Sequence, residues 1–303
     1  MTTTTITRTS TEKTLLQRLD GLQQIPTIPA VLAPLLRYLQ QPVEQIDVRK
    51  VTDLLSQDES LAAQCLRMAN SPLFGRGKDV QSLRAAVVSL GFHHVSDIAM
   101  SCGMLKILPG ENCTLDPVVF WEHSLGCALI CRHLATQIDF GDPGKAYLAG
   151  LLHDLGIIVN LWILPKEFEE AWDVAKAEGI PLHEAEQRCL GFTHCESGRL
   201  LAEHWNLAPE MIDVVNCHHS PEKSKDSSGL AALVQLSDLL CRMSELNYGY
   251  VERRQVNLLE EAGFAQLAQY SKNLGHFDWA RLTFELESYR EEVHSLVRAI
   301  YRT

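Results

Sequence analysis

The sequence predicts an all-α fold, and three observations support that prediction. Apolar residues recur every three or four positions along most of the chain, which is the period of an amphipathic helix. Residues that begin helices and residues that end them bracket several of these stretches. No segment shows the apolar–polar alternation of a half-buried strand. These features together favour helices packed on helices.

Two helices are predicted in the first third of the chain. Asp58 precedes a stretch with apolar residues at helical spacing, and Asn70-Ser71-Pro72 ends it. Ser82 precedes Leu83–Leu90, whose apolar residues lie on one stripe, and Gly91 follows as a helix stop.

Two longer helices are predicted further along. Asp116-Pro117 is typical of an N-cap followed by proline in the first helical position, so a helix is expected from there toward Ile138. The last helix should begin near Asp278, since apolar residues follow at offsets that fit one helical face: Leu282, Leu286, Tyr289, Val293, Leu296 and Ile300.

Three polar or irregular segments divide the chain. Residues 107–116 separate the N-terminal helices from the half that carries most of the histidines, and residues 220–229 and 248–255 are expected to be connections within that half. We therefore predict a disordered Thr-rich tail over residues 1–11, an N-terminal helical subdomain over 12–106, and a second helical domain over 107–303.

Composition and charge restrict the classes of function. The formal charge is −11 and no long Lys/Arg run offsets it, which makes nucleic-acid binding unlikely. No uninterrupted apolar run is long enough to cross a bilayer, and the chain does not start with a secretory signal pattern. The nine cysteines are scattered and odd in number, which fits free thiols in a reducing cytoplasm. We expect a cytoplasmic protein without membrane insertion.

The stretch LLHDLG, Leu151–Gly156, is the most informative in the chain. It puts His153 and Asp154 inside what reads as an apolar helix, where burying two ionisable groups costs several kcal/mol unless they are paired or bind a metal. A buried His-Asp pair can satisfy itself by a hydrogen bond, so the pair alone does not decide between the two interpretations.

Five further ligand-type residues lie in apolar helical sequence. His123 shares a helical face with Val119, Cys127 and Ile130, and Asp238 lies between Val234 and Cys241. The others are His194, His218 and His219. With His153 and Asp154, seven ligands come from five predicted helices, which a helix bundle can gather inward. Imidazoles and carboxylates suit Fe, Mn, Zn or Ni, and so many ligands can hold one or two such ions. Cys195 and Cys217 flank three of the histidines and are interpreted as packing residues.

At these residues the sequence resembles the HD superfamily of metal-dependent phosphohydrolases. Within it, residues 18–245 resemble the HDOD signalling output domain, a relative of the HD-GYP cyclic-di-GMP phosphodiesterases. The resemblance rests on IPTIPAVLAPLL, LLSQDESLAAQCLRMANSPLFG and SLRAAVVSLG in the first half, and on WEHS, AYLAGLLHDLG, THCESGRLLAEHWNLAPEMIDVVNCHHSP and VQLSDLL in the second. It implies an N-terminal helical subdomain packed on an HD-type helical bundle.

The resemblance also implies roles for the seven residues. His123, His153, Asp154 and Asp238 match the four-ligand metal site of the superfamily. The remaining histidines match those that build a second metal position in HD-GYP enzymes: His194, His218 and His219. Asp154 would then bridge the two ions, and it would be the catalytic carboxylate if the protein is active.

Three departures from the HD-GYP pattern bear on activity. Ile157 stands where those enzymes usually have a Lys, which removes a cation for developing phosphate charge. SPEKSKDSSG replaces the GYP loop, and Val119 replaces an acidic residue that some HD-GYP enzymes use for a third metal. The resemblance thus implies a metal site without its cyclic-dinucleotide equipment.

Three hypotheses for function follow. The first is a metal-binding signalling module that acts through protein partners or a small phosphorylated or nucleotide ligand, with little or no hydrolase activity. The second is a metal-dependent phosphohydrolase with a two-metal site, and the third is a di-iron oxygenase. Hydrolysis of a charged phosphodiester would need a cation near the metal, for which Lys145, Lys166 and Arg199 are the candidates.

Overall fold

The structure is a computed structural model that describes residues 33–34, 47–75, 80–104, 107 and 114–301. The predicted tail over residues 1–11 lies outside the described residues. So do most of the chain before residue 47 and residues 108–113 of the predicted linker. The boundary between residues 106 and 107 stays a prediction.

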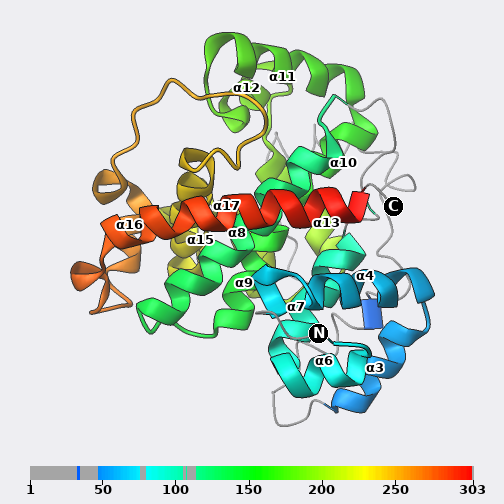
Figure 1. Cartoon of the computed structure of the whole chain (residues 1–303). Coiled ribbons are helices and arrows are strands. Elements are labelled where there is room, and N and C mark those ends of the chain that lie inside the picture. The colour runs from blue at the N-terminus through cyan, green and yellow to red at the C-terminus, as the bar shows by residue number, and fades with distance from the viewer. Residues whose placement is uncertain (1–32, 35–46, 76–79, 105–106, 108–113, 302–303) are drawn as a thin grey trace, which may run out of the picture.

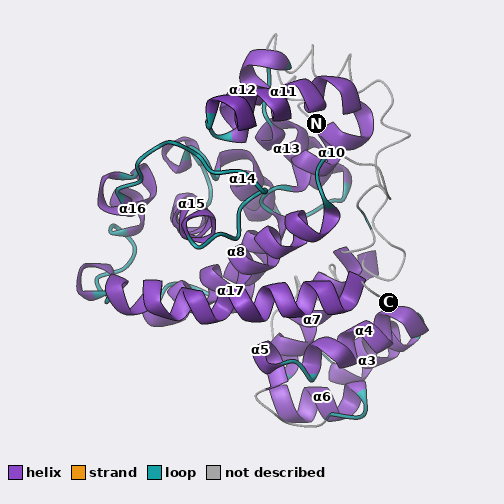
Figure 2. Cartoon of the chain, turned by 45° about the horizontal axis from the view of Figure 1, so that its top comes forward, coloured by secondary structure: helices purple, strands orange, loops and turns teal. Residues whose placement is uncertain are grey.

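The predicted all-α fold is confirmed, since helices and connecting loops account for the whole described part of the chain (Figure 2). The N-terminal helices are α3 Val48–Ser56, α4 Glu59–Ala69, α5 Pro72–Gly75, α6 Leu83–Leu90 and α7 Phe92–Met104. The helices that follow are α8 Pro117–Gln137, α9 Pro143–Leu152, α10 Leu155–Ile163, α11 Pro165–Glu178, α12 Leu182–Cys189, α13 His194–His204, α14 Pro209–Cys217, α15 Ser228–Met243, α16 Ala262–Leu267 and α17 Trp279–Tyr301.

The helix starts predicted from the sequence are confirmed by their capping hydrogen bonds. The Asp58 side chain accepts a hydrogen bond from the Leu61 amide, and Ser82 accepts one from Ala85. Asp116 caps α8 with Pro117 as the first helical residue. Each cap satisfies an amide that has no partner inside its helix, which is why these side chains mark the starts.

Two helices form the centre of the C-terminal bundle. α8 and α15 pack against each other, and both bury residues on several faces along their middle turns. α9 also packs on both of them, while α17 crosses the outside of α8 (Figure 1). Because α8 and α15 are enclosed, any polar side chain on their inner faces must find a partner inside the protein.

The N-terminal helices pack on this bundle through two elements. α7 lies against α9, and α17 runs from α8 to α4 and α5 (Figure 1). Buried polar contacts hold the first junction: Ser101 on α7 shares a 2.7 Å hydrogen bond with Tyr147 on α9, and Asp97 pairs with Arg132 on α8. The two halves therefore share a partly polar interface.

One local prediction is wrong. The pair His153–Asp154 does not lie inside a helix but in a turn between α9 and α10. His153 is the C-cap of α9, and Asp154 precedes α10 with φ −99° and ψ 18°, outside the helical region. A continuous helix would place adjacent side chains about 100° apart, so the break allows both to face one cluster.

The stretch Pro143–Ile163 is long and apolar enough to cross a membrane by composition, but 83% of its most apolar window is buried inside the protein. It comprises α9, the His153–Asp154 turn and α10. Its apolar character is explained by packing in the core around the turn.

Candidate metal centre

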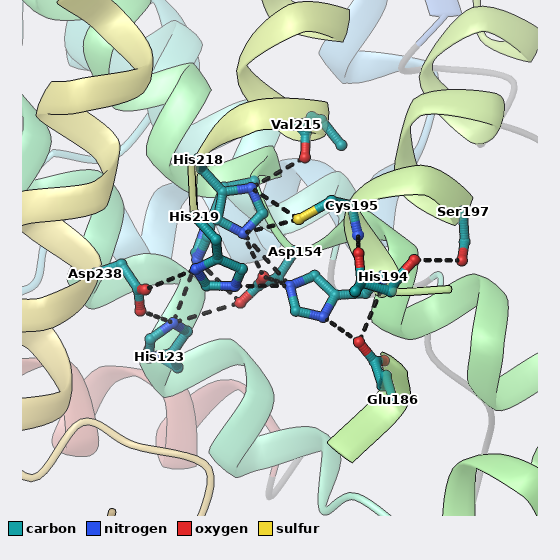
Figure 3. Close-up of polar contacts among 12 residues, drawn as sticks. His123, Asp154, Glu186, His194, Cys195, Ser197, Val215, His218, His219 and Asp238 are labelled. Carbon is teal, nitrogen blue, oxygen red and sulfur yellow. Dashed lines mark hydrogen bonds and ion pairs between the residues drawn. The ribbon is translucent and has the colours of Figure 1, made fainter. Parts of the chain in front are cut away.

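The structure brings all seven predicted residues into one cluster, and Figure 3 labels all of them except His153. Six are between 0 and 3% exposed, and the His219 side chain is 14% exposed. They come from α8, the α9–α10 turn, the first residue of α13, the end of α14 and the middle of α15. The predicted gathering of these residues is thus present in the fold.

A first group surrounds one oxygen of Asp154. Its Oδ2 lies 2.9 Å from Nε2 of His153 and 3.5 Å from Nε2 of His123. The two imidazole nitrogens are 3.4 Å apart, and Asp238 Oδ1 lies 3.3 Å from His123 Nε2. Two imidazoles and two carboxylates therefore converge here.

A second group surrounds the other oxygen of Asp154. Its Oδ1 lies 3.2 Å from Nε2 of His194 and 3.4 Å from Nε2 of His218. Nε2 of His194 is 3.4 Å from that of His218 and 3.1 Å from that of His219. Asp154 consequently stands between the two groups with one oxygen facing each (Figure 3).

The other ring nitrogen, Nδ1, is occupied in four of the histidines. His123, His153 and His218 donate from Nδ1 to the carbonyl oxygens of Leu246, Gly150 and Val215, at 2.7, 2.7 and 3.0 Å. Nδ1 of His194 lies 2.6 Å from Glu186 Oε2. Since carbonyl oxygens and a carboxylate only accept, Nδ1 carries the proton and Nε2 offers a lone pair to the cluster.

These contacts require a cation between the rings. In the pairs His123–His153 and His194–His218, two neutral imidazoles approach at 3.4 Å with both lone pairs facing, and they need a proton or a metal ion between them. Asp154 Oδ1 is buried and has no hydrogen-bond donor among the described residues. Tetrahedral coordination with metal–nitrogen distances of about 2.0–2.1 Å spaces the ligand nitrogens about 3.3 Å apart, which agrees with these separations. The residues fit one or two transition-metal ions.

A buried acid that the sequence analysis missed positions His194. Glu186 on α12 is fully buried, and its Oε2 accepts hydrogen bonds from both Nδ1 and the backbone amide of His194. Its Oε1 accepts a hydrogen bond from Asn160, which in turn accepts one from Ser197. A carboxylate on the distal nitrogen fixes the ring and strengthens its donor atom.

A partly buried arginine, which could not be assigned from the sequence, neutralises part of the cluster. Arg242 lies one turn after Asp238 on α15 and donates to Asp238 Oδ2 at 2.6 Å and to Glu252 at 2.6 Å. Burial opposes ionisation of Asp238, but Arg242 and then His123 hold the pKa of this carboxyl well below its usual range. The sequence signal for this pair is its spacing, because Asp238 and Arg242 are four residues apart and so lie on one face of the helix.

The cations predicted from the sequence lie elsewhere. Lys145 pairs with Glu210 at 2.7 Å and Arg199 with Glu203 at 2.5 Å. Lys166 is exposed at the start of α11. The cation that the structure brings to the cluster is Arg242, and two carboxylates already hold it.

The pKa values of the clustered carboxyl and imidazole groups are shifted by the charges of their neighbours. Burial alone would raise the pKa of Asp154, but the imidazoles around it, His153 foremost, hold that pKa well below its usual range. Burial lowers the pKa of His218, yet Cys195 and Asp154 overcome this and raise it to about 10. The metal-free cluster thus binds protons where a metal ion would otherwise lie.

A surface cleft of about 590 Å³ opens beside the second group. Its lining includes His219 and Cys195, and it also includes His183, whose ring stacks on that of His219 at 4.0 Å. Burial, followed by His194, lowers the pKa of His183 to about 3, so this ring is neutral. No role for His183 could be predicted from the sequence, because nothing near it in the chain marks it as close to His219.

Cys195 lies within the same cluster, although the sequence favoured a packing role for it. Its sulfur is 3.9 Å from both ring nitrogens of His218 (Figure 3). Burial would raise the pKa of this thiol, but His218 and His194 outweigh burial and lower it to about 6.

Known proteins are similar to this chain over most of its length. A crystal structure of an HDOD domain protein of unknown function from Geobacter sulfurreducens superposes with a TM-score of 0.81 at 28% identity, covering 95% of this chain and 98% of that one. An uncharacterized protein of Treponema pallidum is 24% identical over 271 residues, which are 88% of this chain and 52% of that protein.

Part of the chain is also similar to ribonuclease Y. The ribonuclease Y of Lawsonia intracellularis is 28% identical over 171 residues, which are 56% of this chain and 26% of that protein. The chain therefore spans about half the length of the Treponema relative and about a quarter of the length of the Lawsonia ribonuclease Y.

The resemblance stated from the sequence is confirmed by a match to the family itself. Residues 25–221 match the HDOD domain family, which is well over half of the chain and includes six of the seven clustered residues. With the helical fold and its structural relative in agreement, the chain belongs to the HDOD domain family.

Proposed function

We propose that this protein is a metal-binding signal-transduction output module of the HDOD type, with little or no hydrolase activity. The seven clustered residues would hold one or two transition-metal ions: His123, His153, Asp154, His194, His218, His219 and Asp238. The ions would stabilise a defined arrangement of the helices, and protein partners or a small ligand would respond to that arrangement. Localisation in the cytoplasm and signalling proteins as partners belong to the same proposal.

The observation that supports a non-catalytic role most is the enclosure of the ligands. Six of them are at most 3% exposed, and the cleft reaches only His219 of the seven. A phosphodiester substrate needs room beside the ions and cations for its charge. The basic residues in the cleft are Arg188 and Lys223, and the acids Glu184 and Glu196 line it too. Arg188 also pairs with Glu178 at 2.6 Å.

A metal-dependent phosphohydrolase is the second candidate, and the complete ligand set favours it. Two ions bridged by a carboxylate supply Lewis-acid activation of a phosphoryl oxygen and of an attacking water. Asp154 has the position of such a bridge, since each of its oxygens faces one group of imidazoles. The partial similarity to ribonuclease Y, a nuclease by name, points in the same direction.

A turnover assay separates the two candidates. The purified chain, supplied in turn with Mn, Fe, Zn and Ni, would be incubated with cyclic-di-GMP, single-stranded RNA and a chromogenic phosphodiester. We expect turnover no greater than that of Asp154→Ala, because Ile157 and the paired cations leave the phosphate charge uncompensated. Turnover well above the variant, at a rate typical of HD-GYP enzymes, would establish the hydrolase instead.

A further inference from the structure

Cys195 shares a small volume with three of the clustered histidines. Its Sγ and one ring nitrogen each of His194, His218 and His219 all lie within 4.8 Å of one another. Three of these side chains are buried, and the fourth, His219, is partly exposed. For metal–nitrogen distances of about 2.0–2.1 Å and a metal–sulfur distance of about 2.3 Å, tetrahedral ligands lie about 3.3–3.6 Å apart. The 3.9 Å between Cys195 Sγ and His218 Nε2 is slightly longer than that range, and a small movement of either side chain would bring it within the range.

The local backbone keeps Cys195 beside His194. The two are the first residues of α13, and Thr193 caps the helix by accepting from the Cys195 amide at 3.3 Å. Glu196 closes the capping box by accepting from the Thr193 amide. The capped start of a helix favours a negative group, and a metal-bound sulfur is a thiolate.

The neighbouring cysteines have different surroundings. The Cys217 sulfur contacts Asp213 and Asn216, and burial together with Asp213 raises the pKa of its thiol to about 11. Cys241 donates to backbone oxygens of His123 and Leu246 at 3.5 Å. Cys217 lines the same cleft as Cys195 and therefore serves as a matched control.

We propose that Cys195 supplies a thiolate ligand to the metal ion held by His194, His218 and His219. This inference rests on the proposed metal binding and deepens it. On coordination the thiol releases its proton to solvent and the sulfur forms a bond to the ion, without oxidation or reduction. The second position then offers sulfur in addition to nitrogen and the Oδ1 oxygen of Asp154, whereas the first offers only nitrogen and oxygen. Sulfur ligands favour Zn²⁺ over Mn²⁺, so the two positions differ in metal preference.

Cobalt substitution tests this directly. Metal-free wild-type protein, Cys195→Ser and Cys217→Ser would be titrated with Co²⁺, and the near-ultraviolet absorption would be recorded. A sulfur-to-cobalt charge-transfer band should appear in the wild type and in Cys217→Ser and be absent in Cys195→Ser. Zinc affinity at the second position should fall in Cys195→Ser by more than the about 10–100-fold that an outer-shell partner contributes.

The outcomes separate this inference from the proposed function. Absence of cobalt binding in the wild type would contradict both. Cobalt binding without a sulfur band, or with a band that survives in Cys195→Ser, would overturn only the role of Cys195.

A measurement on the unmodified chain covers the case in which the serine variant fails to fold. Wild-type protein with and without Zn²⁺ would be treated with a maleimide, and the labelled cysteines identified by mass spectrometry. Zinc should slow labelling of Cys195 and leave Cys217 unchanged. Equal labelling of Cys195 in both samples would overturn the inference.

Discussion

Among single residues, Glu186 is expected to control the second proposed metal position without itself being a ligand. It holds both the ring and the amide of His194. We predict that Glu186→Gln weakens metal binding at that position by about 10–100-fold, because an amide cannot replace the carboxylate that fixes and activates the ring. Binding at the first position should change little, since the carboxylate of Glu186 accepts its hydrogen bonds from His194 and Asn160.

Calorimetric titration with Zn²⁺ measures both affinities. Glu184→Gln is the control, because Glu184 lies on the same helix with a half-exposed side chain whose partner is Arg188. Equal effects of the two substitutions would show that Glu186 does not position His194.

Protons and metal compete for the same nitrogens. The raised pKa of His218, about 10, means that this imidazole is protonated near neutral pH when no metal is bound. A metal ion must displace that proton, so affinity should rise as the pH is raised from about 6 to about 8, and binding should release protons. Calorimetry in buffers of different ionisation enthalpy measures the release. Affinity independent of pH over this range would contradict the cluster's role as the binding site.

The clustering of the seven residues could be predicted because each interrupts an apolar helical pattern, and the resemblance to the family gave their order. Glu186, Arg242 and His183 were missed for a physical reason. Their roles depend on which helices pack together, and single acidic, basic or imidazole groups on half-apolar helices are usually solvated. Only the structure shows that Glu186 is fully buried.

For the helices, the crossing of α10 and α13 fixes where His194 lies. Gly156 on α10 and Gly198 on α13 allow the backbones to touch: a Cβ on Gly156 would fall 1.7 Å from the carbonyl oxygen of His194. The backbone atoms there cannot move aside as a flexible side chain would. The crossing therefore admits glycine alone at this point.

We predict that Gly156→Ala destabilises the fold by at least about 1–3 kcal/mol, the usual penalty for overpacking, and moves His194 away from Asp154. Denaturant unfolding measures the first effect and metal titration the second. Gly275→Ala is the control, since no atom lies within 4 Å of a Cβ at that position. Wild-type stability in Gly156→Ala would mean that the crossing is looser than described.

The helix starts could be predicted from capping residues, whereas the break at His153–Asp154 could not be predicted from the local sequence. Asp58, Ser82 and Asp116 satisfy amides through local hydrogen bonds, which the sequence alone encodes. The turn at His153 has no glycine or proline at the break itself, and the residues on both sides are apolar. Contacts from α8, α13 and α14 with the pair accompany this break, so it depends on tertiary packing.

At the scale of the whole molecule, the His/Asp cluster connects to the N-terminal helices. Glu122, next to His123 of the cluster, is buried and lies 2.8 Å from His294 on α17. α17 reaches α4 and α5, and α7 packs on α9, the helix that ends at the His153 turn. The amphipathic N-terminal helices thus pack their apolar faces on the same helical body that contains the cluster.

We predict that removing the metal destabilises both halves in one shared transition, because an ion that binds only the native state stabilises everything that unfolds with it. Hydrogen exchange of residues 58–69 and 82–90, with and without metal, measures the coupling. Protection there should fall on chelation. Unchanged protection would show two independent modules and would remove the physical basis for a signalling role.

Metal content tests the central claim most directly. Wild-type protein, Asp154→Ala and the control Glu184→Gln would be purified without chelator and analysed for transition metals, with helix content checked by circular dichroism. We predict about one to two ions per chain in the wild type and the control, and a sharp loss in Asp154→Ala, since Asp154 faces both groups of imidazoles. A wild-type protein without metal, or full metal content in Asp154→Ala, would contradict the account and leave the seven residues as a buried hydrogen-bond network.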